Sequence, residues 1–123
     1  MPTAISPQDL AARLTEYWSP RVIGEVDDNY VKVARLLGTF GWHAHDAEDE
    51  LFFVLRGRLR IEMEAGAVEI AAGEFYVVPR GVRHNPVADE EVHVLLFERK
   101  TTLHSGSEIN EKTRTIDEQL RAL

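Results

Sequence analysis

Short runs of Val, Ile, Leu, Phe and Tyr recur between residues 21 and 99, separated by Gly, Pro or Asp-Asn signals. Within Arg58–Met63 the alternation of apolar and charged positions is strict, which is typical of a strand with one face turned to water. The next residues, Glu64 to Gly66, predict a tight hairpin. The pattern predicts strands over Arg21–Val26, Tyr30–Leu37, Leu51–Leu55, Arg58–Met63, Ala67–Ile70, Phe75–Val78 and Glu91–Glu98. Strands this short and closely spaced favour an all-β sandwich or barrel.

A short helix is predicted before the strands. Ser6 can act as its N-cap, and Pro7 and Asp9 suit the first helical turn. Pro20 ends the helical pattern, because the residue before a proline avoids helical geometry. The apolar stripe of this helix is Leu10, Leu14 and Tyr17.

The segment 107–123 is polar, with a second set of positions at helical spacing. The set is Thr113, Ile116, Leu120 and Leu123. We expect either a docked C-terminal helix or a frayed tail here. The expected organisation is thus a single domain over residues 1–123, with an N-terminal helical part at 1–20, a barrel core at about 21–99 and a tail at 107–123.

Composition excludes several classes of function. The 14 Lys and Arg against 21 Asp and Glu give a net charge of −7, whereas a protein that binds nucleic acid needs a basic face. The longest apolar run, Leu51–Leu55, is far shorter than the ~20 residues of a membrane span. The chain has no Cys, and its N-terminus shows no pattern of an export signal. We therefore expect no nucleic-acid partner, no membrane partner and a cytoplasmic location.

Three His and one Glu carry the chemistry. On a strand, His43 and His45 would point to the same side about 6.6 Å apart, so that two imidazoles can bind one ion. Glu50 opens the next predicted strand, and His84 follows a Pro-x-Gly turn. A lone strand His is more often packed or solvated than a ligand, but this combination outweighs that alternative. Three nitrogens and one oxygen suit one divalent transition metal: Mn, Fe, Ni, Co or Zn.

These residues resemble the two motifs of the cupin superfamily, G(X)5HXH(X)3-4E(X)6G and G(X)5PXG(X)2H(X)3N. The matching positions are Gly38, His43, His45, Glu50 and Gly57, then Gly73, Pro79, Gly81 and His84. Two positions depart: Gly38 is one residue too close to His43, and Ala88 replaces the final Asn. The resemblance implies a double-stranded β-helix with a metal inside. The spacing between the motifs resembles the small single-domain type labelled mannose-6-phosphate-isomerase-like.

Catalytic residues are not assigned by these motifs, and two weaker candidates remain. His93 shares a predicted strand face with Leu95 and Phe97, and it could act as a general base if that face lines the cavity. The alternative is a strand His satisfied by a neighbour. Tyr76 could present its hydroxyl to the cavity or belong to the core.

Other side chains near the motifs have structural interpretations. Lys32 and Arg35 lie an odd number of positions apart, so on an unbulged strand they point to opposite faces. One of the two cations then lies on the inner side of the strand, which would suit an anionic substrate. We expect Trp42 to pack away from the ligand face. His104 lies in a polar segment and receives no role.

Three classes of function remain open. The first is a metal-dependent enzyme acting on a small organic molecule by dioxygenase or isomerase/lyase chemistry, as the resemblance implies. The second is a non-catalytic cupin that binds a sugar or a carboxylate, and the third is a structural domain with a vestigial site. The resemblance and the open strand edges of a single small barrel also predict a homodimer.

Overall fold

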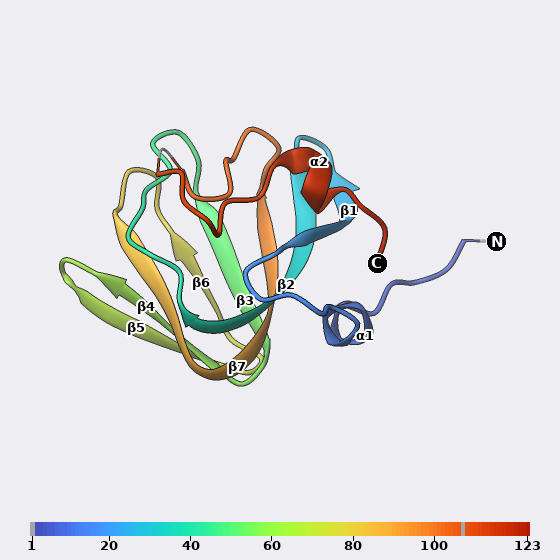
Figure 1. The fold of residues 1–123 in the computed structure, drawn as a ribbon, viewed down its shortest axis with the longest axis horizontal. Coiled ribbons are helices and arrows are strands. Elements are labelled where there is room, and N and C mark those ends of the chain that lie inside the picture. Colours follow the sequence, from blue (N-terminus) through green and yellow to red (C-terminus); the bar gives the residue numbers. More distant parts are fainter. Residues whose placement is uncertain (1, 107) are drawn as a thin grey trace.

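Antiparallel strands organise the computed structural model, which describes residues 2–106 and 108–123 (Figure 1). The strands are β1 (Arg21–Val26), β2 (Asn29–Thr39), β3 (Glu50–Arg56), β4 (Arg58–Met63), β5 (Gly66–Ala71), β6 (Phe75–Val78) and β7 (His84–Arg99), and the helices are α1 (Pro7–Ala12) and α2 (Ile116–Gln119). The predicted all-β fold is confirmed. Met1 and Ser107, which the expected helical part and tail include, lie outside the described residues.

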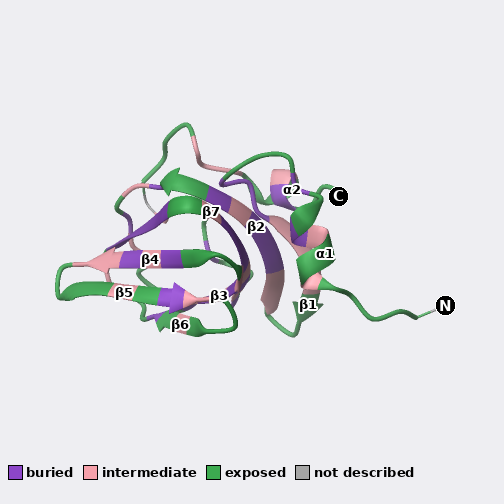
Figure 2. Cartoon of the chain, turned by 90° about the horizontal axis from the view of Figure 1, so that it is seen from below, coloured by how far each residue is buried: buried purple, intermediate pink, exposed green. Residues whose placement is uncertain are grey.

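The long strand β7 connects the two parts of the sheet. Residues 92–99 of β7 pair with β2 on one side and, for the most part, with β3 on the other, in the strand order β1-β2-β7-β3-β6. Residues 84–87 of β7 pair with β4, which forms a hairpin with β5. The sheet therefore curves around one interior, as Figures 1 and 2 show, in the manner of the expected double-stranded β-helix.

The predicted bounds of β1, β4 and β6 agree with the structure, whereas β7 begins at His84 rather than at Glu91. Pro86 and the acidic residues that follow it interrupt the apolar alternation, which hid this part of the strand. Pro86 cannot donate a ladder hydrogen bond, but its carbonyl oxygen accepts one from the N–H of Phe40 at 3.1 Å. The strand continues through the proline because Pro86 pairs with Ile61 of β4, and its two neighbours pair with β4 as well.

The interior is filled from alternate positions of the strands. Leu59 and Ile61 of β4 are fully buried, as the alternation predicts. Figure 2 shows the buried stretches along β2 and β7 where these strands cross the middle of the sheet. The main core cluster also includes Phe40, Phe52 and Val94.

Helix α1 packs on the outer face of the sheet and is shorter than predicted. The Ser6 hydroxyl accepts a hydrogen bond from the Asp9 N–H at 3.2 Å, which confirms the N-cap. Buried Ala11 and Leu14 pack against Val33. The helix ends at Ala12 rather than near Pro20. After it, the chain turns to run beside β2 through a single bridge from residue 17 to residue 35.

Helix α2 docks through a face that the apolar pattern did not predict. Thr115 and Glu118 form a capping box around its first turn. Ile116 and Leu120 of the predicted stripe are 40% and 48% exposed, whereas Gln119 is 2% exposed. Gln119 accepts a hydrogen bond from the buried Lys32 ammonium at 2.5 Å, so a polar contact holds this segment.

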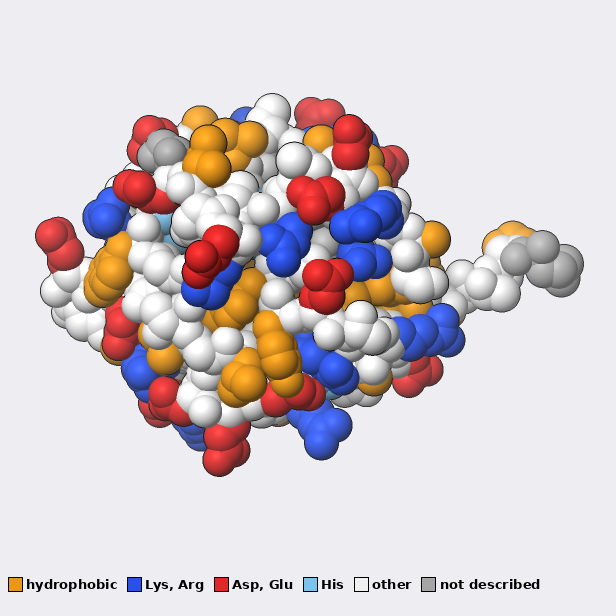
Figure 3. Space-filling model, viewed as in Figure 1, with side chains coloured by type: hydrophobic (Ala, Val, Ile, Leu, Met, Phe, Trp, Pro, Cys, Tyr) orange, Lys and Arg blue, Asp and Glu red, His pale blue; other side chains and the backbone are white. Residues whose placement is uncertain are grey.

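Acidic, basic and hydrophobic side chains are interspersed over the face shown in Figure 3. No helix in the described part of the chain is both long and apolar enough to cross a membrane.

Two motif glycines offer a matched test of this packing. Gly57 and Gly73 both have φ of +87°, but a Cβ on Gly57 would lie 2.7 Å from the carbonyl oxygen of Glu91, whereas nothing lies within 4 Å of one on Gly73. Both alanine variants carry the left-handed strain of about 1–2 kcal/mol. We expect Gly57→Ala to lose about 2 kcal/mol more free energy of unfolding than Gly73→Ala, because the backbone must also shift. Chemical denaturation followed by circular dichroism measures both, and equal losses would contradict the packing described.

Candidate metal centre

The four residues singled out by their spacing come together inside the barrel. His43 and His45 lie in the segment between β2 and β3, Glu50 is the first residue of β3, and His84 is the first residue of β7. Each is 5% exposed or less, and one ligand atom from each lies within 4.8 Å of the others. This group could hold a metal ion.

The segment that carries His43 and His45 is an extended loop rather than the expected strand. Its only bridge among the described residues joins His43 to His84, with N–H to carbonyl distances of 2.9 and 2.8 Å. Alternation still places both imidazoles inward and turns Trp42 outward. Trp42 is 39% exposed, so the expectation that it packs was wrong.

Backbone carbonyls orient two of the imidazoles. Nδ1 of His43 lies 3.0 Å from the carbonyl oxygen of Gly41, and Nδ1 of His84 lies 2.9 Å from that of Val82. A carbonyl oxygen only accepts hydrogen bonds, so each Nδ1 must donate. The Nε2 atom of each ring keeps its lone pair for an ion, as in many metal sites.

Three buried atoms at the centre of the group have no hydrogen-bond partner among the described residues: Nε2 of His45, Nε2 of His84 and Oε1 of Glu50. The carboxylate oxygen lies 3.5 Å from each of these nitrogens. That distance is long for a hydrogen bond. It falls within the ~3–4 Å that separates neighbouring ligands around an ion bound at about 2.1 Å. The donor set and its geometry therefore fit a divalent transition metal.

The pKa shifts follow from burial and from Glu50. Burial lowers the pKa of His43 to about 4, with a further contribution from His84. Burial also opposes charge on His45, but the facing Glu50 carboxylate outweighs it and raises the pKa of His45 above its usual 6.5. Burial disfavours ionised Glu50 as well, yet His45 and His84 hold its pKa well below the usual range.

A second buried carboxyl, Glu98, adjoins the site and was not singled out from the sequence. It pairs in register with Glu50 across β7 and β3, and burial together with the Glu50 charge raises its pKa well above the usual range. Its partner is Lys32, 1% exposed, whose ammonium lies 2.7 Å from the Glu98 carboxyl. Lys32 is thus the inward-pointing cation that the alternation of strand faces predicted. The same alternation indicates Glu98, which shares its face of β7 with Val94 and Leu96.

The two weaker candidates do not reach the cavity. Val94 and Leu96 line it, so His93 lies on the opposite face of β7, with Nε2 2.9 Å from the Glu91 carboxylate. The condition for a general base at His93 is not met. The Tyr76 hydroxyl lies 3.9 Å from a methionine sulfur, and the ring packs against the core, as its alternative interpretation had it.

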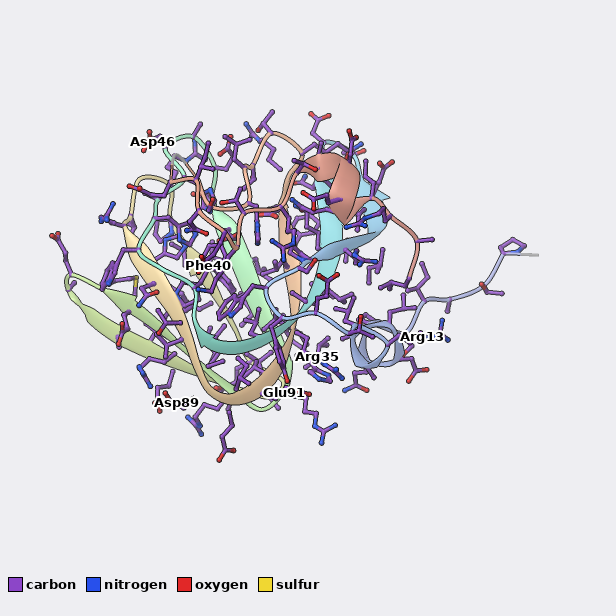
Figure 4. All side chains as sticks on the ribbon, viewed as in Figure 1. Arg13, Arg35, Phe40, Asp46, Asp89 and Glu91 are labelled. Carbon is purple, nitrogen blue, oxygen red and sulfur yellow. The ribbon has the colours of Figure 1, made fainter. Side chains whose placement is uncertain are left out.

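A cavity lies beside His43 and Glu50, and His104 forms part of its wall. The His104 ring lies 5.0 Å from that of Phe40, which in turn lies 5.0 Å from that of His43. In Figure 4 Phe40 lies within the outline of the sheet, whereas the labelled acid Asp46 lies at its margin. Burial lowers the pKa of His104 to about 4. The polar composition of its segment concealed this position.

Comparison with known proteins agrees with this architecture. A family model described as a cupin domain matches residues 35–98, which is more than half of the chain. The chain belongs to the cupin family. A cupin-2 domain-containing protein from Shewanella frigidimarina is 38% identical, with a TM-score of 0.76 over 78% of this chain and 94% of that one. A protein from Neisseria meningitidis is 29% identical, with a TM-score of 0.72 over 80% of this cupin and 100% of that chain.

Protein YdbB of Bacillus subtilis is 36% identical over 63 residues, which make up 50% of this cupin and 56% of YdbB. The chain therefore spans little more than half the length of that relative. The mannose-6-phosphate-isomerase-like subtype stays a prediction.

The pKa of His45 leads to a pH dependence of metal binding. A proton on this ring competes with the metal, and because its pKa lies above 6.5, the metal must displace this proton in more of the molecules at pH 5 than at pH 8. His43, with a pKa of about 4, contributes little over this range. We expect Mn²⁺ to bind at least roughly thirty-fold more tightly at pH 8 than at pH 5. Isothermal titration calorimetry measures this, and equal affinities would remove His45 from the site.

Proposed function

We propose that this cupin binds one divalent transition metal (Mn, Fe, Ni, Co or Zn) through His43, His45, Glu50 and His84. We further propose that it acts as a metal-dependent enzyme on a small organic molecule, by dioxygenase or isomerase/lyase chemistry. The observation that carries the proposal is the convergence of ligand atoms from four buried residues, three of these atoms without a hydrogen-bond partner among the described residues.

The chain's own residues prepare this site. The carbonyls of Gly41 and Val82 fix the rings of His43 and His84 with Nε2 directed away from the backbone contact. Glu50, whose pKa is held well below the usual range, supplies a carboxylate. Four protein ligands leave two positions on a six-coordinate ion. A bound metal of this kind can polarise an oxygen of a substrate, lower the pKa of a water or activate dioxygen.

The alternative function is binding of a sugar or carboxylate without catalysis. A vestigial site has less support, because unpaired polar atoms destabilise a barrel interior unless something binds them. Turnover separates an enzyme from a binding module: Fe(II)-dependent oxygen uptake supports a dioxygenase, and anaerobic activity with Mn²⁺ or Zn²⁺ supports isomerisation or elimination. Stabilisation by a ligand with no turnover would favour the binding module.

A matched pair of carboxylate variants tests the metal site. Glu50 faces the imidazoles, whereas Glu91 lies on the outer face of β7 beside His93 and Arg35. We expect Glu50→Gln, which keeps the shape of the side chain, to weaken Mn²⁺ binding at least ten-fold because a neutral amide is a poor ligand. Glu91→Gln should bind Mn²⁺ as the unaltered chain does. Metal content after dialysis and calorimetry measure both, and unchanged binding in Glu50→Gln would refute the ligand set.

We also propose that the chain forms a homodimer. Strand β6 pairs only with β3 among the described strands, so one of its edges is open. Phe75 and Val77 on this strand are 61% and 38% exposed. Exposed apolar side chains on an open edge favour pairing with another chain.

Sedimentation velocity checks the association. We expect one species of twice the 14.0 kDa chain mass, and a Phe75→Lys variant should shift it towards the monomer. A monomer of the unaltered chain at micromolar concentration would overturn the proposal.

A further inference from the structure

The cavity beside His43 and Glu50 has walls made almost entirely of carbon. Its volume is about 40 Å³, or about 370 Å³ when the solvent space at its mouth is included. Its apolar lining includes Trp18, Leu36, Phe40, Phe52, Val94 and Leu96. Such walls favour an apolar surface over a hydroxylated or charged one, since polar groups of a ligand would lose water without gaining partners.

The described wall offers few hydrogen-bonding groups to a ligand, because most of its side chains are apolar and the indole N–H in it already has a partner within the protein. The indole N–H of Trp18 donates to the carbonyl oxygen of Leu37 at 2.7 Å. Pro20 and Pro86 also line the cavity, and proline has no backbone N–H. Apart from the proposed metal ligands, the only titratable side chain among the described lining residues is that of His104.

The inner cation does not serve this cavity either. Lys32 does not belong to its lining, and its ammonium is held by Glu98 at 2.7 Å and by Gln119 at 2.5 Å. The one charged side chain among the described lining residues is Glu50, a proposed metal ligand that offers no positive group to a bound molecule. A phosphate or an additional carboxylate on a ligand would therefore meet no free positive side chain in the described wall.

The proton position on His104 follows from one contact. Its Nδ1 lies 2.8 Å from the backbone nitrogen of Arg114, whose N–H donates to it. An accepting Nδ1 carries no proton, so the ring is neutral and its proton sits on Nε2. Nε2 makes no hydrogen bond within the described part of the chain. Nothing among the described residues accepts from this N–H, and His104 belongs to the cavity wall, so the group can donate to a ligand there.

We propose that the cavity receives a small molecule with an apolar body and a metal-chelating oxygen head, not a sugar phosphate, and that His104 hydrogen-bonds the head. This rests on the proposed function, because the head lies where the metal ligands converge. The ligand group that meets His104 is a hydrogen-bond acceptor, because the available group of His104 is a donor, and an oxygen of the head can fill this role. The apolar body fills the space between Phe40, Phe52 and Leu96.

Two hydroxamates and a sugar phosphate test the ligand class. Acetohydroxamate and benzohydroxamate share a chelating oxygen head and differ in a methyl against a phenyl body. With the Co²⁺-loaded protein we expect benzohydroxamate to bind at least ten-fold more tightly, and mannose 6-phosphate to bind more weakly than either. Cobalt absorption and calorimetry measure this. Equal hydroxamate affinities, tighter sugar-phosphate binding, or no hydroxamate binding by cobalt-loaded protein would overturn the inference and leave metal binding standing. Failure to take up cobalt at all would refute the proposed function and the inference with it.

Variants locate the binding in this cavity. Val94 lines it, whereas Val92, on the same buried face of the same strand, does not. We expect Val94→Thr to reduce the preference for benzohydroxamate at least three-fold and Val92→Thr to leave it unchanged. A preference that is equal in the two variants would place the phenyl body elsewhere.

Two variants of His104 distinguish the role of its Nδ1 atom from that of its Nε2 atom. In His104→Asn the amide can still accept from the Arg114 N–H but cannot reach the position of Nε2, whereas in His104→Gln the amide nitrogen reaches that position. We expect His104→Asn to weaken both hydroxamates by a similar three- to ten-fold factor and His104→Gln to retain most of the affinity. Unchanged affinity in His104→Asn would show that His104 does not contact the head.

Discussion

Polar atoms without partners inside an apolar barrel are the constraint on which this structure depends. Nε2 of His45, Nε2 of His84 and Oε1 of Glu50 face one point and have no hydrogen bonds among the described residues. Folding such groups away from water is unfavourable unless a ligand compensates them. The surrounding fold supplies what keeps them there: the reciprocal bridge between His43 and His84 and the pairing of β3 with β7. The site is thus a property of the sheet rather than of the loops alone.

The interior has two ends with different chemistry. At one end Lys32, Glu98 and Gln119 form a buried polar group, in which the Lys32 ammonium contacts both partners. At the other end the described wall is apolar, and His104 is the titratable side chain in it that is not a proposed metal ligand. Glu50 lies between them, in register with Glu98. Because a carboxyl whose pKa is raised sits beside one whose pKa is lowered, the pair avoids carrying two negative charges in the barrel.

Local alternation was enough to predict most of the strand positions, and the spacing within two short motifs was enough to single out the four candidate ligands. The first half of β7 was missed because Pro86 and the acids after it break the alternation, while the pairing with β4 that makes it a strand is a tertiary effect. The docking face of α2 was missed for a similar reason: Gln119 is buried by a distant lysine, not by its own helix pattern. His104 reaches the cavity through the path of the chain after β7, which no periodicity encodes.

Strand β7 has a consequence for how the molecule comes apart. It carries His84 at its first residue and pairs with β2, β3 and β4 along its length, so it joins segments that are far apart in the sequence. Such pairings form late, since long loops must close first. Ion affinity would therefore report the integrity of the whole sheet: detaching this strand at any point along its length would misalign His84 or the β3 edge that carries Glu50.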